Sequence, residues 1–281
     1  MIAPFQYFGG KRTVAAAVWQ RFGRPKQFIE PFCGSAAVLL AAPAAASLEV
    51  VGDTSGFIAN FWRATVAQPG AVAQWADYPV SHIDLGARHQ WLMDQRGALA
   101  DGLRDANWPG DAKVAGWWLW GQCAWIGSGW CEWSGKVPHV SDAGRDPAMW
   151  TSGGETARRW LRQLAARMER VRVVHGDWTR CLNHHFGGAQ TAVFLDPPYK
   201  AYEALYGSTP IAADVEQWAR ENADLRIAIC GHAGDYDLPR WEAARWNRGS
   251  LTYGGATTTA DECVWYSPAC LPVGLFAEAV S

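Results

Sequence analysis

The stretch QFIEPFCGSAAVLLAAPAAASLEVVGD, residues 27–53, decides the fold. It opens with a short strand at 27–30, turns at a Gly-Ser pair and continues into a helix of small residues at 36–42. A second strand at 48–53 follows and ends in an acid. A strand, a glycine-containing turn, a helix and a further strand with a terminal acid predict the first half of an open α/β sheet, whose ligands bind at the carboxyl ends of the strands.

The same alternation continues on both sides of this stretch and is interrupted once. We expect further helices at 11–22 (with Thr13 as its candidate N-cap), 55–66 and 156–170, and further strands at 171–177, 191–195, 226–230 and 262–266, the last of them antiparallel or at an edge. Between 68 and 154 the pattern changes to helical pieces such as 87–103, a Trp- and Gly-rich run and a polar loop. The sequence therefore predicts an α/β domain in two parts, 1–67 and 155–281, with an inserted, mainly helical subdomain at 68–154.

The composition is that of a folded protein of a reducing compartment. Of its 281 residues, 49% are hydrophobic and 19% charged, which excludes a disordered chain, a collagen-like repeat and a disulfide-stapled miniprotein. We expect a soluble intracellular protein, because the N-terminus lacks a signal-peptide pattern and no apolar run approaches the ~18 residues of a membrane span. The seven Cys include no C-x-x-C pair, so we expect free thiols and no metal site. A net charge of −2 means that any attraction to nucleic acid must come from a local basic surface.

The segment with the most specific chemistry is Asp196-Pro197-Pro198-Tyr199, directly after the apolar strand at 191–195. The two prolines make it rigid and leave carbonyl acceptors beside a carboxylate. The exocyclic amino group of a nucleobase is a poor nucleophile. The Asp196 carboxylate and the Pro197 carbonyl can hold its two hydrogens and direct its lone pair toward a methyl donor, while Tyr199 stacks on the base. The alternative interpretation is a rigid loop after a strand.

Three further segments precede this one. They are the run Tyr7-Phe8-Gly9-Gly10-Lys11, the turn Glu30-Pro31-Phe32-Cys33-Gly34-Ser35-Ala36 and the strand-terminal Asp53. The first combines an aromatic ring, two glycines that allow close backbone approach and a cation at a helix start. The second and third place acids at the ends of neighbouring strands, where a doubly wound sheet binds its ligand.

The order of these four segments resembles the Dam-like family of adenine-specific DNA methyltransferases, which use S-adenosylmethionine. Residues 261–268 also resemble the closing strand of that family. The resemblance covers about residues 1–66 and 171–268, and it implies a Rossmann-like seven-stranded methyltransferase sheet. The insertion at 68–154 occupies the place of the family's target-recognition region.

The resemblance also implies how S-adenosylmethionine is held. Tyr7 would form an aromatic wall and Lys11 a polar anchor near the methionine part. Asp53 would bind the ribose hydroxyls, and Asp177 would meet the adenine amino group with Trp178 against the ring. The implied cofactor-binding residues are Tyr7, Gly9, Gly10, Lys11, Glu30, Pro31, Cys33, Gly34, Ser35, Asp53, Asp177, Trp178 and Asp196. Ala36 departs from the family pattern, because relatives often have Gly there, and each acid has an alternative interpretation as a helix N-cap or a surface charge.

The implied partner is double-stranded DNA. Among the 18 Trp, those at 117, 118, 120 and 125 have near-helical spacing and are expected in a core. The residues expected to contact DNA are Trp130, Trp133, Lys136, His139 and Arg145 of the insertion and Arg158 and Arg159 of a basic stretch that also contains Arg162, Arg167, Arg170 and Arg172. A solvated helix face is the alternative interpretation of that stretch.

The expected reaction is transfer of a methyl group to N6 of a flipped-out adenine, with Asp196, Pro197, Pro198 and Tyr199 as catalytic segment and Tyr199 and Trp178 on the two faces of the base. The chemistry needs no metal. We expect the protein in the cytoplasm of a bacterial or phage-infected cell. The alternatives are methylation of N4 of cytosine and a non-catalytic DNA-binding or anti-restriction relative, and a small-molecule or RNA methyltransferase is the least favoured.

Overall fold

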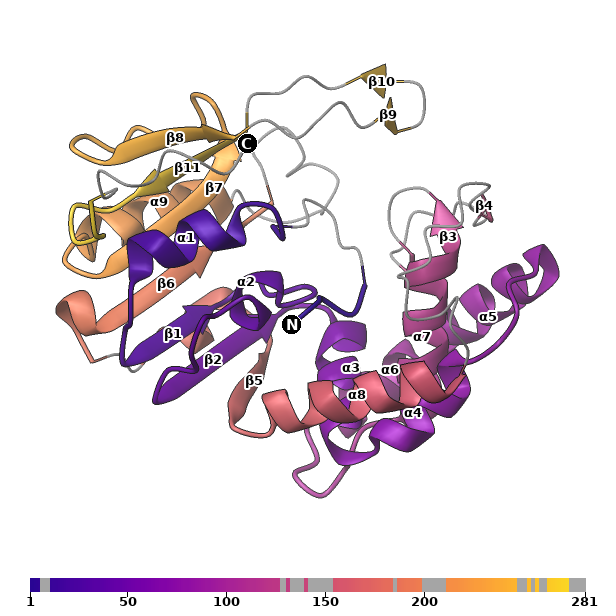
Figure 1. Cartoon of the computed structure of the whole chain (residues 1–281). Coiled ribbons are helices and arrows are strands. Elements are labelled where there is room, and N and C mark those ends of the chain that lie inside the picture. The colour runs from indigo at the N-terminus through magenta and orange to yellow at the C-terminus, as the bar shows by residue number, and fades with distance from the viewer. Residues whose placement is uncertain are drawn as a thin grey trace. The chain divides into compact units, whose positions relative to one another are not determined.

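The computed structural model describes residues 1–5, 11–126, 130–131, 139–140, 154–183, 186–198, 211–246, 252–253, 256–257 and 262–272. Within these residues the protein is an α/β structure with a seven-stranded mixed sheet and nine α-helices (Figure 1). The chain divides into two compact units, the first made of residues 1–2, 11–51 and 178–281 and the second of residues 3–10 and 52–177. The predicted subdomain at 68–154 lies inside the second unit, and its boundaries stay a prediction.

The large sheet has the strand order β5-β2-β1-β6-β7-β11-β8. Its strands are β1 (Gln27–Glu30), β2 (Leu48–Asp53), β5 (Val171–His175), β6 (Thr191–Leu195), β7 (Arg226–His232), β8 (Glu242–Trp246) and β11 (Glu262–Tyr266). The pairs β1 with β2, β1 with β6 and β6 with β7 are parallel, whereas β11 is antiparallel to both β7 and β8. The predicted Rossmann-like fold is therefore confirmed, including the antiparallel strand at 262–266.

The strand order reverses between β1 and β6. From this point the chain order runs outward through β2 and β5 on one side and through β7 on the other. Such a reversal is the topological switch point at which open α/β sheets bind their ligands. Every residue of β1 and of β6 is buried, which explains why the apolar residues of these strands are adjacent and do not alternate with exposed polar ones.

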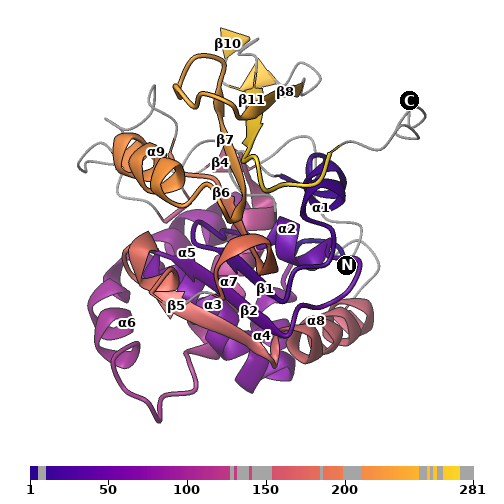
Figure 2. The ribbon, with the colours of Figure 1, turned by 90° about the vertical axis from the view of Figure 1, so that its left-hand side faces the viewer.

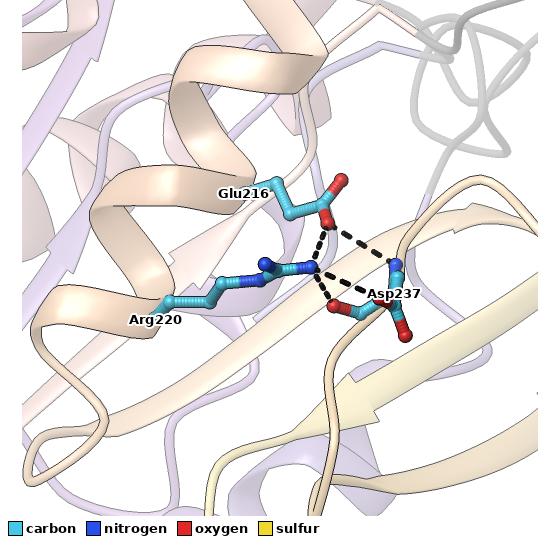
Figure 3. Close-up of polar contacts among 3 residues, drawn as sticks. All are labelled: Glu216, Arg220 and Asp237. Carbon is cyan, nitrogen blue, oxygen red and sulfur yellow. Dashed lines mark hydrogen bonds and ion pairs between the residues drawn. The ribbon is translucent and has the colours of Figure 1, made fainter.

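The helices of the first unit cover both faces of its strands. They are α1 (Ala15–Phe22), α2 (Ala37–Leu40) and α9 (Ile211–Glu221). Figure 2 shows α1 and α2 on one side of the strands and α9 on the other. Helix α9 is tied to the loop after β7 by Glu216, Arg220 and Asp237 (Figure 3). The Glu216 carboxylate accepts from Arg220 Nη2 at 2.6 Å and from the Asp237 backbone N–H at 3.2 Å, and Arg220 also donates to the Asp237 carbonyl.

The second unit is mainly helical. It contains α3 (Gly56–Ala67), α4 (Pro69–Ala76), α5 (His82–Asp94), α6 (Arg96–Gly102), α7 (Ala112–Ala124) and α8 (Gly154–Met168), and the short strands β3 (Trp125–Ile126) and β4 (His139–Val140) pair antiparallel. Helices α3, α4, α7 and α8 pack on one another around Trp62 and Trp118, which are both at most 2% exposed. Trp118 and Trp120 are buried as predicted, whereas Trp117 and Trp125 are half-buried.

Several predicted boundaries are wrong, for local backbone reasons. Helix α1 is regular only from Ala15, and Val14, not Thr13, is its N-cap. The helix predicted at 36–42 is only the single turn of α2, because Ala36 adopts a left-handed conformation. The strand predicted to reach residue 177 ends at His175, since Gly176 has a φ of +122°.

Other differences are elements that the sequence pattern did not predict. The stretch predicted as helical over 87–103 forms the two helices α5 and α6, which meet at Gln95. Helix α5 begins earlier than expected because the Ser81 hydroxyl accepts the Asp84 N–H at 3.1 Å and caps it. Helices α4 and α9 and strand β8 were not predicted.

Candidate active site

A buried ion pair lies where β6 ends. Asp196 directly follows β6, and its Oδ1 lies 2.9 Å from Nζ of Lys11, which precedes α1. The side chains are 16% and 4% exposed. Burial by itself would lower the pKa of Lys11, but the attraction and hydrogen bond of Asp196, together with Cys230 and Glu262, raise that pKa. Lys11 is therefore a fixed positive charge beside the Asp196 carboxyl group.

Glu30 occupies the matching place at the end of β1. It is 3% exposed, and its Oε2 accepts the backbone N–H of Leu39 in α2 at 3.0 Å. Burial raises the pKa of Glu30 to about 8, the backbone hydrogen bonds oppose this, and the negative charge of Asp196 adds to it. Glu30 and Asp196 are thus two carboxyl groups close enough to influence one another, and Lys11 pairs with Asp196.

The turn between β1 and α2 contains two residues in the left-handed region of backbone conformation, separated by one residue. Gly34 has a φ of +44° and Ala36 a φ of +50° with a ψ of +38°. The Ala36 N–H donates to the Cys33 carbonyl at 2.6 Å, and Ala36 is fully buried. A left-handed backbone costs a residue with a Cβ about 1–2 kcal/mol, which gives a physical reason for the Gly of the resembling family at this place. Pro31, Cys33 and Ser35 are buried in the same turn.

Three aromatic rings meet beside this turn. Phe32 and Trp178 stack with ring centroids 5.9 Å apart, and Trp218 of α9 meets Trp178 edge-on at 6.1 Å. Trp178 is 5% exposed as a result. The sequence singled out Trp178 but neither Phe32 nor Trp218, because a single aromatic residue in a turn or on a helix carries no signal of its own.

Asp53 and Asp177 belong to the second unit. Asp53 ends β2, and its Oδ1 accepts the Ser55 N–H at 2.9 Å in the turn before α3, whose N-cap is Ser55 and not Asp53. Its carbonyl accepts the N–H of Gly176 at 3.0 Å. Asp177, one residue further on, is exposed.

Residues 7–82 match the family model of D12 class N6 adenine-specific DNA methyltransferases. This confirms the resemblance to the adenine-specific DNA methyltransferases over that part of the chain. The match includes Lys11, Glu30 and Asp53 and supports DNA N6-adenine methylation as the general activity of the D12 class. A search of curated proteins found no match.

Several predicted site residues beyond the D12 match lie in the described structure. Pro197 is buried and Pro198 half-buried directly after Asp196. Trp130 is 2% exposed, with its ring 5.2 Å from His89 and 6.2 Å from Trp125, so it packs inside the second unit. Its contact with DNA stays a prediction, for which burial offers no support.

Four arginines of the basic stretch lie on α8, whereas Arg170 follows the helix and Arg172 lies in β5. Arg158 and Arg159 are exposed, while Leu161 and Leu164 on the opposite face are buried. Arg162 pairs with Glu155 at 3.0 Å. An exposed arginine face is compatible with phosphate contacts and equally with the solvated-face alternative.

The remaining predicted site residues lie outside the described residues. They are Tyr7, Gly9, Gly10, Trp133, Lys136, Arg145 and Tyr199, and of His139 only the backbone, in β4, is described. Within the described part of the chain, no group of His, Cys, Asp and Glu side chains could hold a metal ion. No helix there is both long and apolar enough to span a membrane.

Proposed function

We propose that this protein transfers a methyl group from S-adenosylmethionine to N6 of an adenine flipped out of double-stranded DNA. The observation that carries the proposal is the buried group of Lys11, Glu30 and Asp196 at the carboxyl ends of β1 and β6. A doubly wound sheet binds ligands at this switch point. The family match over residues 7–82 supports adenine in DNA as the target.

The charges of this group suit S-adenosylmethionine as the cofactor. Burial raises the pKa of Glu30 to about 8 and the negative charge of Asp196 adds to this, so a ligand that brings positive charge would favour the ionised form of Glu30. S-adenosylmethionine carries an ammonium and a sulfonium, and when bound it supplies an electrophilic methyl carbon. We assign its binding to Tyr7, Gly9, Gly10, Lys11, Glu30, Pro31, Cys33, Gly34, Ser35, Asp53, Asp177, Trp178 and Asp196.

Asp196 would act on the target amino group. Its carboxylate and the Pro197 carbonyl accept the two N6 hydrogens, so that the nitrogen lone pair points at the methyl carbon. As the nitrogen–carbon bond forms, the sulfur–carbon bond of the donor breaks, and one N6 proton leaves by way of Asp196 to water. Lys11 holds Asp196 ionised and in position until the amino group arrives. Tyr199 would stack on the flipped base.

Flipping the base costs a few kcal/mol, which contacts to the DNA backbone must offset. We assign residues 68–154 to target recognition and 1–67 and 155–281 to catalysis. The proposed DNA contacts are Arg158 and Arg159 of α8, with Trp133, Lys136, His139 and Arg145. The proposed place of action is the interior of a bacterial or phage-infected cell.

The direct test is to incubate the protein with methyl-labelled S-adenosylmethionine and either unmethylated DNA or RNA, and to digest each product to nucleosides. The expected label is in N6-methyladenine. Label in N4-methylcytosine, or in RNA alone, would overturn the assignment of the target. Calorimetry of S-adenosylmethionine without DNA separates a catalytic protein from a relative that only binds DNA, because such a relative would show no cofactor binding.

A further inference from the structure

The second unit contains two cations set among aromatic rings, which we call the cation–aromatic cluster. Its members are Tyr78 after α4, Arg88 and Trp91 of α5, and Lys113, Trp117 and Trp120 of α7. Trp91, Lys113 and Trp117 are half-buried and Tyr78 is 40% exposed, so the cluster reaches the surface. It belongs to the second unit, and of its tryptophans the sequence predicts only Trp117 and Trp120, as core residues.

Arg88 is the buried cation of the cluster. Its guanidinium carbon lies 4.3 Å from the ring centroid of Tyr78 and 4.2 Å from that of Trp120, while its side chain is only 7% exposed. Nη1 is buried without a hydrogen-bond partner. Burial lowers the pKa of Arg88. The nearby carboxylate of Asp84 is instead hydrogen-bonded to the Ser81 hydroxyl at 2.6 Å.

Lys113 approaches the same indole as Arg88. Its Nζ lies 4.3 Å from the ring centroid of Trp117 and 4.3 Å from that of Trp91, and the Arg88 guanidinium lies 5.1 Å from the Trp117 centroid. The Trp117 indole N–H is also buried without a partner. Among the described residues, no carboxylate oxygen comes within 4.0 Å of either cation.

If the cluster served only to pack the helices together, this arrangement would lower the stability of the fold. Aromatic faces attract cations, but they leave the N–H donors in the guanidinium plane unsatisfied, and a buried charge without hydrogen bonds opposes folding. Those donors match two oxygens of a phosphate, which a guanidinium binds side-on. A phosphate at the exposed side of the cluster would compensate both positive charges.

We propose that the cation–aromatic cluster binds a phosphodiester of the DNA backbone, with Arg88 and Lys113 as the anion contacts. The identity of the anion as DNA rests on the proposed function. A phosphate contact carries no sequence information, so the cluster positions the duplex and leaves base recognition to other residues.

The test measures DNA binding in the absence of cofactor. Fluorescence anisotropy gives the affinity for two labelled duplexes of unrelated sequence at a series of NaCl concentrations. The variants are Arg88→Met and Lys113→Met. Arg104→Met is the matched control, because Arg104 is 81% exposed and pairs only weakly with Asp101 at 3.7 Å. Each cluster variant should bind both duplexes about tenfold more weakly near 0.1 M salt, and each should lower the slope of log K against log salt by about one.

Thermal melting separates this role from packing. Loss of an unpaired buried charge should leave the melting temperature of Arg88→Met unchanged or raise it, whereas a packing role predicts a lower melting temperature and unchanged affinity. Lys113→Met, at a half-buried position, keeps the test decisive if Arg88→Met does not fold. Affinities and slopes equal to those of Arg104→Met would overturn the proposal. Weaker binding of one duplex alone would overturn the phosphate assignment in favour of base recognition.

The same experiment distinguishes this inference from the proposed function. Binding that depends on Arg88 and Lys113 in a protein that methylates no DNA would overturn the methyltransferase proposal and support the cluster. If the protein methylates DNA and both variants bind DNA normally, the methyltransferase proposal is supported and the cluster proposal is overturned. A wild-type protein that binds neither duplex would overturn both.

Discussion

The two units treat buried charge in opposite ways. In the first, Lys11 is buried next to Asp196 at 2.9 Å, with Glu30 nearby, so the charges compensate one another inside the protein. In the second, Arg88 and Lys113 are set among aromatic rings with no carboxylate of the described residues within 4.0 Å. Charges that compensate one another inside the protein can act on a ligand without opposing folding. Uncompensated charge favours a surface whose partner is another molecule.

The units also differ in how they fill their cores. Residues 52–177 contain 12 of the 18 Trp, whereas the sheet of the first unit is filled by Val, Ile, Leu and Phe of strands such as β1 and β6. Glycine on α7 also allows the backbone of α4 to come close. Gly116 of α7 is such a case, because a Cβ there would meet Trp75 Cβ at 2.4 Å and the Val72 carbonyl oxygen at 2.7 Å.

The largest effect should come from breaking the compensated charges of the first unit. Asp196→Asn keeps the shape of the side chain but removes the carboxylate that would accept from the adenine amino group. We expect methyl transfer to fall by about 10²–10⁴-fold, the usual contribution of a positioned acid or base. The measurement is the initial rate of label transfer to DNA. Asp101→Asn, at an 82% exposed acid, is the matched control and should keep the wild-type rate.

Full activity of Asp196→Asn would contradict the proposed mechanism. If the variant no longer binds the cofactor and this loss accounts for the fall in rate, Asp196 acts on the cofactor and not on the target amino group. Calorimetry with S-adenosylmethionine on the same sample distinguishes these outcomes.

Glu30 should make the stability of the protein depend on pH. Its folded pKa of about 8 lies above the ordinary value of 4.5, so the folded state binds a proton that the unfolded state releases. This stabilisation is complete below pH 4.5 and is lost as pH rises toward 8, by at most about 1.4 kcal/mol for each pH unit. Glu30→Gln should remove this component. The measurement is the difference between wild-type and variant unfolding free energies in urea at pH 5, 6, 7 and 8.

A constant difference across these pH values would mean that Glu30 is ionised in the folded protein. Saturating S-adenosylmethionine should also reduce the pH dependence of the wild type, because a cation beside Glu30 lowers its pKa. That second result would sharpen the view that the charges of the first unit are arranged around a ligand.

The packing of the second unit should be sensitive at Gly116. In Gly116→Ala the new methyl group meets backbone and Cβ atoms of α4, which cannot swing aside as a long side chain can. We expect a loss of about 2–3 kcal/mol in unfolding free energy, typical of overpacking. Urea unfolding followed by circular dichroism measures it. An unchanged midpoint would show that α4 and α7 separate easily and that the second unit is loosely packed.

Sequence reasoning located the first unit far better than the second. The strands at 27–30, 48–53, 191–195 and 262–266 were predicted at their observed bounds, because buried strands give continuous apolar runs that end in acids or turns. It also singled out Lys11, Glu30 and Asp196. Their mutual contact was not predictable, since it depends on the strand order that brings β1 beside β6.

The second unit shows why the rest could not be predicted. Helix α7 has Trp and Gly on all sides, so its apolar residues show almost no helical periodicity. Its charged residue Lys113 gives no sign that its partners are rings of α5 and α7, because cation–aromatic contacts have no spacing rule along a chain. The set predicted for DNA contact fell instead on Trp130, which is buried, on the exposed Arg158 and Arg159 of α8, and on residues whose side chains lie outside the described structure.

The smallest effect should come from the companion substitution Gly86→Ala on α5. A Cβ at Gly86 meets nothing within 4 Å, and Gly86 is inside a helix that Ser81 caps. Alanine is a better helix former than glycine by about 1 kcal/mol, so the variant should be more stable by about 0.5–1 kcal/mol in the same urea experiment. Opposite signs at Gly86 and Gly116 would locate the tight contact of the second unit at α4 and α7. Destabilisation by both would mean that α5 is packed as closely as α7, and that Arg88 is held by its surroundings more rigidly than its aromatic contacts alone require.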